Sequence, residues 1–124
     1  MNRILISLTF CIVIVSLSGC FGSPQAQLEE MVKKESANLP TRIDGTTTLV
    51  QLEAKPLELV YTYEVKLAGG MLDKKGLEAK VRRELAKKKT ELAQQAAAKI
   101  KLTYVYRDGK KAERYRFTVN TWEL

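Results

Sequence analysis

The sequence predicts an α+β protein in which helices pack on one face of an antiparallel sheet. Apolar residues recur at helical spacing in two segments and alternate with polar residues in several others. The segments follow the order helix, two strands, long helix, two strands. Strands with a single apolar face need a covering layer on that face alone, so the helices are expected on one side. The sequence leaves the order of the strands open.

The first helix is expected from about Pro24 to Ala37. Ser23 is a favourable N-cap residue, and proline suits the first helical position. The Leu39-Pro40 pair ends the segment, because a residue before proline disfavours the helical conformation.

The first two strands are expected between residues 46 and 67. The β-prone run from Thr46 to Val50 begins the first strand, and the chain turns between Ala54 and Pro56. In the second strand, apolar side chains alternate with Glu58, Thr62, Glu64 and Lys66, which predicts a half-buried strand. These apolar positions are Leu57, Leu59, Tyr61, Tyr63, Val65 and Leu67.

A long helix is expected from about Lys74 to Ala98. Its apolar residues lie on one narrow arc, which Lys88 interrupts. That lysine either extends past its apolar neighbours or marks a bend or division of the helix. The arc consists of Leu77, Val81, Leu85, Leu92 and Ala96.

The last two strands are expected to form a hairpin. The first of them runs from Ile100 to Tyr106, and Asp108-Gly109 is a strong hairpin turn signal. In the return strand, Tyr115, Phe117 and Val119 alternate with Arg114, Arg116 and Thr118.

Residues 1–19 have the pattern of a bacterial lipoprotein signal peptide. A short polar start with Arg3 precedes an apolar run that is shorter than the ~20 residues of a membrane-spanning helix. Leu17, Ser18 and Gly19 match the residues that the signal peptidase recognises before a lipid-modified Cys20. We expect a signal peptide at 1–19, a lipidated tether at 20–23 and one domain at 24–124. An ordinary cleaved signal or an uncleaved anchor is the alternative.

The composition disfavours an enzyme. The chain has no histidine, which excludes Ser-His-Asp and Cys-His catalytic sites and imidazole metal sites. Cys11 lies in the signal peptide and the thiol of Cys20 carries lipid, so no thiol nucleophile or disulfide is expected. Glu58 and Glu64 lie too far apart along one strand for a glycosidase pair. We therefore expect no cofactor and no metal.

The chain is basic, with a net charge of +7 that falls to +6 when Arg3 is removed with the signal peptide. Lys80, Arg83 and Lys87 fall on the polar side of the long helix and form a basic stripe. This stripe is a candidate site for anionic lipid, an anionic envelope polymer or an acidic partner. The alternative is a solvated helix face with Glu78–Arg82 and Glu84–Lys88 ion pairs. Nucleic acid is not expected as a partner, because the domain is exported.

The tyrosines of the strands are interpreted as core or cross-strand packing residues rather than a platform for stacking sugars or bases. Trp122 follows the last strand and is either an exposed contact residue or a cap on the core.

Several short motifs follow one another along the chain in a fixed order: Leu39-Pro40, Ile43-Asp44, Thr47-Thr48-Leu49, Ala54, Leu59, Tyr61, Tyr63 and residues 104–109. This pattern resembles a widespread group of small bacterial lipoproteins and exported proteins of unknown function. The group often carries cysteines before the third strand and near the C-terminus, and this chain has none there, so any disulfide of that group is absent.

These observations lead to the hypothesis of a palmitate-bearing, membrane-anchored interaction module of the cell envelope. It would bind an unidentified envelope protein as an adaptor, assembly factor, inhibitor or immunity-type protein, with exposed sheet edges as a possible docking site. Phe21 rather than aspartate after Cys20 predicts the outer membrane, facing the periplasm, in a host with two membranes. The oligomeric state is not predicted.

Overall fold

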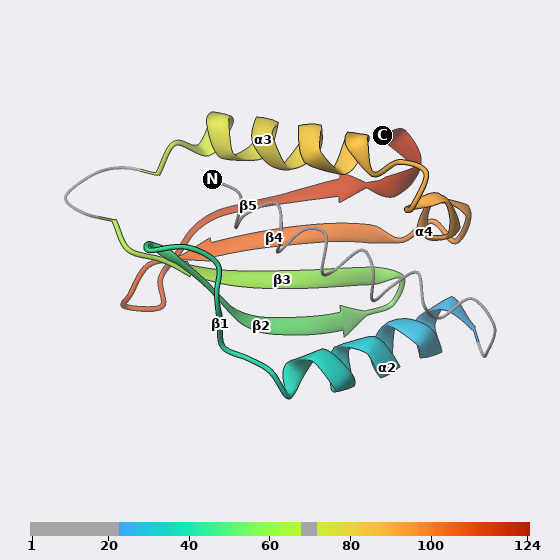
Figure 1. The fold of residues 1–124 in the computed structure, drawn as a ribbon, viewed down its shortest axis with the longest axis horizontal. Coiled ribbons are helices and arrows are strands. Elements are labelled where there is room, and N and C mark those ends of the chain that lie inside the picture. Colours follow the sequence, from blue (N-terminus) through green and yellow to red (C-terminus); the bar gives the residue numbers. More distant parts are fainter. Residues whose placement is uncertain (1–22, 68–71) are drawn as a thin grey trace.

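The computed structural model describes residues 23–67 and 72–124, which form a mixed sheet with helices along it (Figure 1). The helices are α2 (Pro24–Ser36), α3 (Lys74–Lys87) and α4 (Ala93–Ala97), and a 3-10 helix, η1 (Thr121–Glu123), follows the last strand. The strands are β1 (Thr41–Arg42), β2 (Thr47–Lys55), β3 (Glu58–Val65), β4 (Lys101–Arg107) and β5 (Glu113–Asn120).

The α+β class is confirmed, but the expectation of an antiparallel sheet is wrong for one strand pair. The strand order is β1-β2-β3-β4-β5, and β4 lies parallel to β3 while the other neighbours are antiparallel. The segment that contains α3 and α4 leaves β3 at one end of the sheet and returns to the other end before β4 begins. A connection of that length produces parallel neighbours, whereas a short turn produces antiparallel ones.

The element order also differs from the expected one. The strand β1 pairs with β2 in the register Thr41↔Leu49, so three strands rather than two precede α3. The first helix begins as predicted, because the Ser23 side chain accepts a hydrogen bond from the Ala26 backbone N–H at 3.1 Å. It ends at Ser36, one residue before the expected end.

The long helix divides at Lys88, one of the two outcomes that the sequence left open. Lys88 is the C-cap of α3, and a turn separates it from α4. The expected Glu84–Lys88 pair does not form, and the Lys87 ammonium group instead donates to Glu84 at 3.2 Å. The expected Glu78–Arg82 pair does form, at 2.8 Å.

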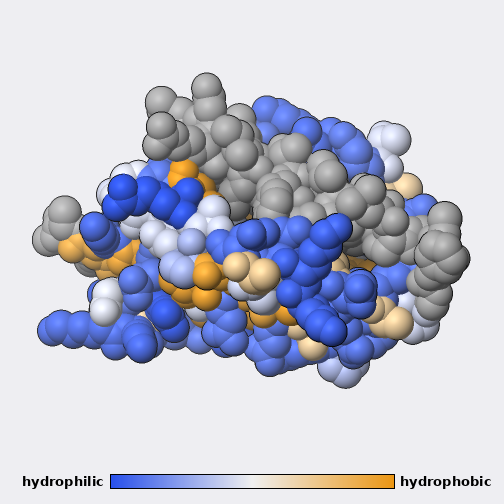
Figure 2. Space-filling view, turned by 60° about the horizontal axis from the view of Figure 1, so that its bottom comes forward, coloured by the Kyte–Doolittle hydropathy of each residue, from blue (hydrophilic) through white to orange (hydrophobic). Residues whose placement is uncertain are grey.

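The core lies on one face of the sheet, between the strands and the helices. Figure 1 shows α2 along the β2 side of the sheet and α3 along the β5 side, with β3 and β4 between them. On the face that Figure 2 shows, the described surface is mostly hydrophilic, with small apolar patches between the polar residues. The buried residues of the core cluster include Leu28, Met31, Leu49, Leu52, Leu59, Tyr61, Tyr63, Val81, Leu85, Leu92, Leu102, Tyr104, Tyr106, Phe117 and Val119.

Candidate functional site

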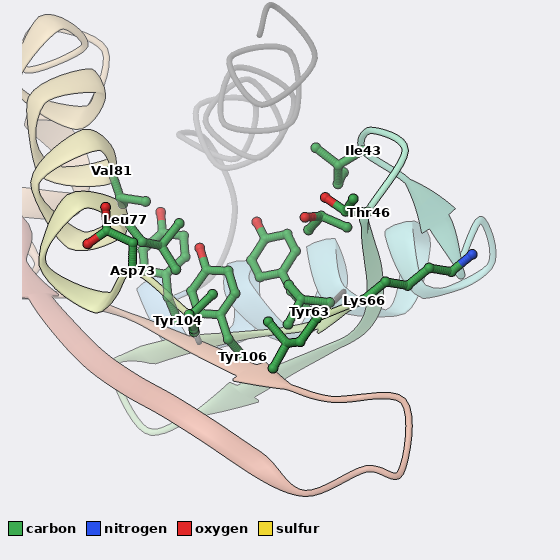
Figure 3. Close-up of a pocket in the computed structure, with 13 residues that line it drawn as sticks. Ile43, Thr46, Tyr63, Lys66, Asp73, Leu77, Val81, Tyr104 and Tyr106 are labelled. Atoms are coloured by element: carbon green, nitrogen blue, oxygen red, sulfur yellow. The ribbon is translucent and has the colours of Figure 1, made fainter. Parts of the chain in front are cut away.

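A pocket of about 230 Å³ opens on the helical side of the sheet, over β3 and β4 (Figure 3). We call it the tyrosine pocket, because Tyr63, Tyr104 and Tyr106 line it from the sheet. The other lining residues come from the β1–β2 connection, the end of β3 and the start of α3. They are Ile43, Thr46, Thr47, Val65, Lys66, Leu67, Leu72, Asp73, Leu77 and Val81.

The tyrosine rings stack on one another across the strands. The parallel register pairs Tyr61 with Tyr104 and Tyr63 with Tyr106, and the ring centroids of these pairs lie 5.0 and 5.1 Å apart. Phe117 continues the stack 5.3 Å from Tyr104. The expectation of cross-strand packing is confirmed, and the stacked ring faces leave little surface for a sugar or a base.

The ring edges and hydroxyl groups, rather than the ring faces, point away from the sheet. Figure 3 shows the hydroxyl groups of Tyr63, Tyr104 and Tyr106 all directed to the helical side. Burial raises the pKa of the Tyr106 hydroxyl, so this group stays protonated at physiological pH. The pocket therefore combines an apolar lining with neutral polar groups at its base.

One wall of the pocket is held by the carboxylate of Asp44. This carboxylate accepts hydrogen bonds from the Thr46 backbone N–H at 2.8 Å, the Thr46 hydroxyl at 3.0 Å and the Thr47 backbone N–H at 2.9 Å. Burial raises the pKa of Asp44, but these hydrogen bonds outweigh it and hold the pKa below its ordinary value. The charged carboxylate thus fixes the turn that places Ile43 and Thr46 at the pocket.

The opposite wall is the first part of α3. Asp73 caps this helix by accepting a hydrogen bond from the Gly76 backbone N–H at 3.1 Å. Leu77 and Val81 lie one turn apart and line the pocket. The Glu78 carboxylate on the same helix accepts hydrogen bonds from the Tyr115 hydroxyl of β5 and from Arg82. These bonds tie the wall to the edge of the sheet.

The sheet edges offer less to a partner than the sequence suggested. The edge strand β1 has only two residues. At the other edge, the guanidinium group of Arg82 donates to the Thr118 carbonyl oxygen of β5 at 3.1 Å. An edge is a template for another strand only where its backbone groups are unpaired and the strand is long.

The residues of the basic stripe lie on α3 as expected. Arg83 and Lys87 are exposed, whereas Lys80 is half-buried, and Lys87 is paired with Glu84. Trp122 is half-buried in η1, and the Lys99 ammonium group lies 5.1 Å from the centre of its ring. The predicted lipid attachment site Cys20 and the residues Leu17, Ser18 and Gly19 lie outside the described residues.

The tyrosine pocket is lined mainly by apolar and neutral polar side chains. Within residues 23–67 and 72–124, no group of three or more His, Cys, Asp or Glu side chains is placed to hold a metal ion. The charged residues that line the tyrosine pocket are Lys66 and Asp73, and Asp73 is engaged as a helix cap. No helix in the described segments has the length and apolar character needed to cross a membrane.

Sequence reasoning missed the tyrosine pocket. The pocket tyrosines and Val81 were assigned to the core, which is correct for their burial, whereas Leu77 of the same apolar arc is only half-buried. The pocket forms between α3 and the β1–β2 connection, and no periodicity or motif in the sequence encodes the distance between these segments.

The fold, but not the sequence, is similar to known proteins. No protein-family model and no curated protein sequence matches the chain. A secreted protein of Pseudomonas aeruginosa has the same fold, with a TM-score of 0.64 and 15% identity over 77% of this chain and 88% of that one. A pilotin of the Vibrio vulnificus type 2 secretion system gives 0.62 and 16% identity, over 79% and 92%. The Vibrio cholerae type II secretion system pilotin gives 0.58 and 10% identity, over 81% and 91%. The chain therefore has the fold that these pilotins have.

Proposed function

We propose that this chain is a lipid-anchored, non-enzymatic interaction module of the bacterial envelope that binds a segment of a partner protein in the tyrosine pocket. The observation that carries the proposal is the pocket itself, an apolar hollow between two rigid walls over the stacked tyrosines. The shared fold with pilotins supports an adaptor or assembly factor among the classes that the sequence suggested.

The size and lining of the pocket indicate what it binds. Its volume of about 230 Å³ is below the ~300–1,000 Å³ typical of sites for drug-sized molecules, so it suits a few side chains. Apolar walls with tyrosine hydroxyls, Lys66 and Asp73 around them suit an amphipathic peptide segment. Such a segment would insert two or three apolar side chains and direct its polar groups to the rim.

The anchor in this proposal is a lipid on Cys20, attached after recognition of Leu17, Ser18 and Gly19. In a host with two membranes, Phe21 favours the outer membrane with the domain in the periplasm. The likeness to pilotins makes components of a type II secretion system the first partners to examine.

Site-specific photocrosslinking in cells tests this proposal. A photoreactive residue at Thr46, an exposed position of the pocket wall, should give one dominant adduct with an envelope protein. The same residue at Gln51, an exposed position of β2 outside the pocket, should not. Equal adducts from both positions would contradict binding in the pocket.

A matched pair of variants on α3 locates the contact. Leu77→Arg places a charge in the pocket and should abolish the adduct from Thr46. Ala79→Arg places the same charge at an exposed position of the same helix and should leave the adduct intact. Circular dichroism of both variants checks that each has folded.

The basic stripe remains the alternative site, for anionic lipid or an envelope polymer. We favour the pocket, because Lys80 is half-buried and Lys87 is paired with Glu84. Charge reversal of Lys80, Arg83 and Lys87 together should leave the adduct from Thr46 unchanged if the pocket is the binding site.

A further inference from the structure

The end of the sheet where α2 begins carries an unusual surface, which we call the anchor end. It consists of Lys55, Leu57, Lys99, Lys101 and Trp122. Two contacts join these residues: the Lys101 backbone N–H donates to the Leu57 carbonyl at 2.9 Å, and the Lys99 ammonium group lies over the Trp122 ring. All three lysines are exposed.

Leu57 is not explained by folding. Its side chain is 41% exposed, the one large apolar residue that is exposed in the described part of the chain. It follows Pro56 in the turn between β2 and β3 with a φ of 53°, a conformation for which glycine or asparagine is preferred. A leucine here therefore strains the backbone and exposes apolar surface at once. Strain that folding does not require points to function.

The charge around Leu57 is positive. Lys55 and Lys101 pair with Glu58, the residue after Leu57, from its two sides in the register of β2, β3 and β4, and Lys99 lies just before β4. The three lysines outnumber the two carboxylates at this end of the sheet, Glu58 and Glu123, which accept hydrogen bonds from the neutral groups of Thr103 and Asn120. An exposed leucine and a tryptophan among lysines is the combination that suits the interface of an anionic bilayer.

The path of the chain brings this surface to a membrane. The Leu57 N–H donates to the Gln25 side-chain carbonyl at 2.7 Å, which joins the anchor end to the first turn of α2. Cys20 precedes Ser23 by three residues, which span at most about 11 Å even when fully extended. A lipid on Cys20 therefore holds Leu57 close to the bilayer surface.

We propose that the anchor end is a second membrane contact, in which Leu57 and Trp122 enter the bilayer interface and Lys55, Lys99 and Lys101 bind anionic headgroups. This inference rests on the lipid anchor of the proposed function. It also gives the domain an orientation. The tyrosine pocket lies toward the opposite end of β3, so docking of the anchor end directs the pocket away from the membrane.

The single tryptophan of the chain is the reporter for a direct test. The mature lipidated protein, which begins at Cys20, is reconstituted into phosphatidylcholine vesicles with or without phosphatidylglycerol, each with lipids brominated near the headgroup. Trp122 fluorescence should be quenched strongly in the anionic vesicles and weakly in the neutral ones. Lipidated protein whose Trp122 is quenched in neither membrane would overturn the inference.

Charge reversal tests the lysines. Lys55→Glu with Lys101→Glu should lower the ratio of docked to undocked protein by at least about 25-fold, since each lysine near an anionic bilayer strengthens binding roughly fivefold. Lys110→Glu with Lys111→Glu changes the same charge at the far hairpin and should leave quenching unchanged. If both double variants weaken docking equally, the membrane responds only to the total charge of the domain, and the assignment of this surface is overturned.

Leu57→Gly separates membrane contact from folding. It relieves the left-handed strain, so the domain should be at least as stable, while the docked-to-undocked ratio falls roughly fivefold because apolar area is lost. Lys111→Gly relieves a φ of 68° at the far hairpin and is the matched control. Quenching unchanged by Leu57→Gly would overturn the role of this side chain.

These outcomes are separate from those of the proposed function. Mass spectrometry of the N-terminus reports whether Cys20 carries lipid, and its absence overturns both the anchor and this inference. Loss of the Thr46 adduct with intact Trp122 quenching overturns the pocket alone.

Discussion

The two faces of the sheet reach burial by different means. On the helical face, large side chains stack across the strands and pack against Leu28, Val81 and Leu85. On the other face, Val60, Thr103 and Val105 are also buried, but they do not belong to that core cluster. One face thus depends on a covering layer, and the other does not.

The second face, which we call the open face, is closed by its own side chains. The register places Thr103 between Val60 and Thr118, and Val105 between Thr62 and Arg116. The Thr103 hydroxyl donates to Glu58 and lies 2.9 Å from the Thr118 hydroxyl. Long side chains such as that of Arg116 cover short branched neighbours with their apolar stems.

This contrast indicates which face binds a partner. On the open face, the hydroxyl groups of Thr103 and Thr118 lie within hydrogen-bonding distance of each other, and Glu58 accepts a hydrogen bond from Thr103. The helical face holds the largest rings, and the tyrosine pocket opens over them between α3 and the β1–β2 connection. A partner gains the most binding free energy on an apolar surface that the protein itself does not fully cover, because binding there buries the most apolar area.

The largest expected change in stability, and the largest difference between the two faces, comes from truncating two adjacent residues that point to opposite faces. Leu59→Ala removes a fully buried side chain (0% exposed) from the helical-face core and should lower the free energy of unfolding by about 3–4 kcal/mol. Val60→Ala, at 4% exposed on the open face, should cost only about 1 kcal/mol, because no helix must collapse around the change. Urea unfolding of both variants measures the difference. Equal losses would show that the two faces are covered alike.

The strands illustrate how much of this contrast the sequence contains. Alternation, interrupted in β3 at Val60, predicted the faces of β3 and β5, and Asp108-Gly109 predicted the hairpin between β4 and β5. Alternation assigns a side chain to a face but says nothing about which strand lies beside it. The parallel neighbours β3 and β4 therefore could not be predicted, although they align Tyr63 with Tyr106.

The pocket and the short elements escaped prediction for related reasons. The strand β1 is too short for a periodic signal, and the Ile43 backbone N–H donates to the Thr47 carbonyl to close its turn. Lys88 marked an interruption without saying whether the helix would bend or divide. The pocket depends on the distance between α3 and the β1–β2 connection, which arises from tertiary packing alone.

A smaller effect should come from the polar network of the open face. Thr103→Val keeps the shape of a side chain that is 1% exposed but removes its hydroxyl, so stability should fall by about 1–1.5 kcal/mol. Glu58 is half-buried and Thr118 is exposed, so water replaces part of the hydrogen bonding that they lose with the Thr103 hydroxyl. A double-mutant cycle with Glu58→Leu tests the coupling, because the double variant should lose less than the sum of the single variants. Strict additivity would mean that the Thr103–Glu58 bond contributes nothing.

The smallest effect should come from the margin where the helical face meets β5. The hydrogen bond from Tyr115, and then that from Arg82, hold the pKa of Glu78 below its ordinary value of 4.5. Tyr115→Phe should therefore lower stability at neutral pH by only about 0.5–1 kcal/mol, since both groups are partly exposed.

The pH dependence of this loss has a definite sign. A carboxyl whose pKa is lower in the folded state stabilises the fold above its unfolded pKa, and that stabilisation disappears as the pH falls through the folded value. The unfolding curves of the wild type and Tyr115→Phe should therefore converge in acid and separate near neutrality. In a Glu78→Gln background, Tyr115→Phe should lose this pH dependence. If the stability difference between the wild type and Tyr115→Phe persists unchanged in acid, the effect of Tyr115 comes instead from packing of its ring against Phe117, 5.5 Å away. The margin would then be an extension of the helical-face core.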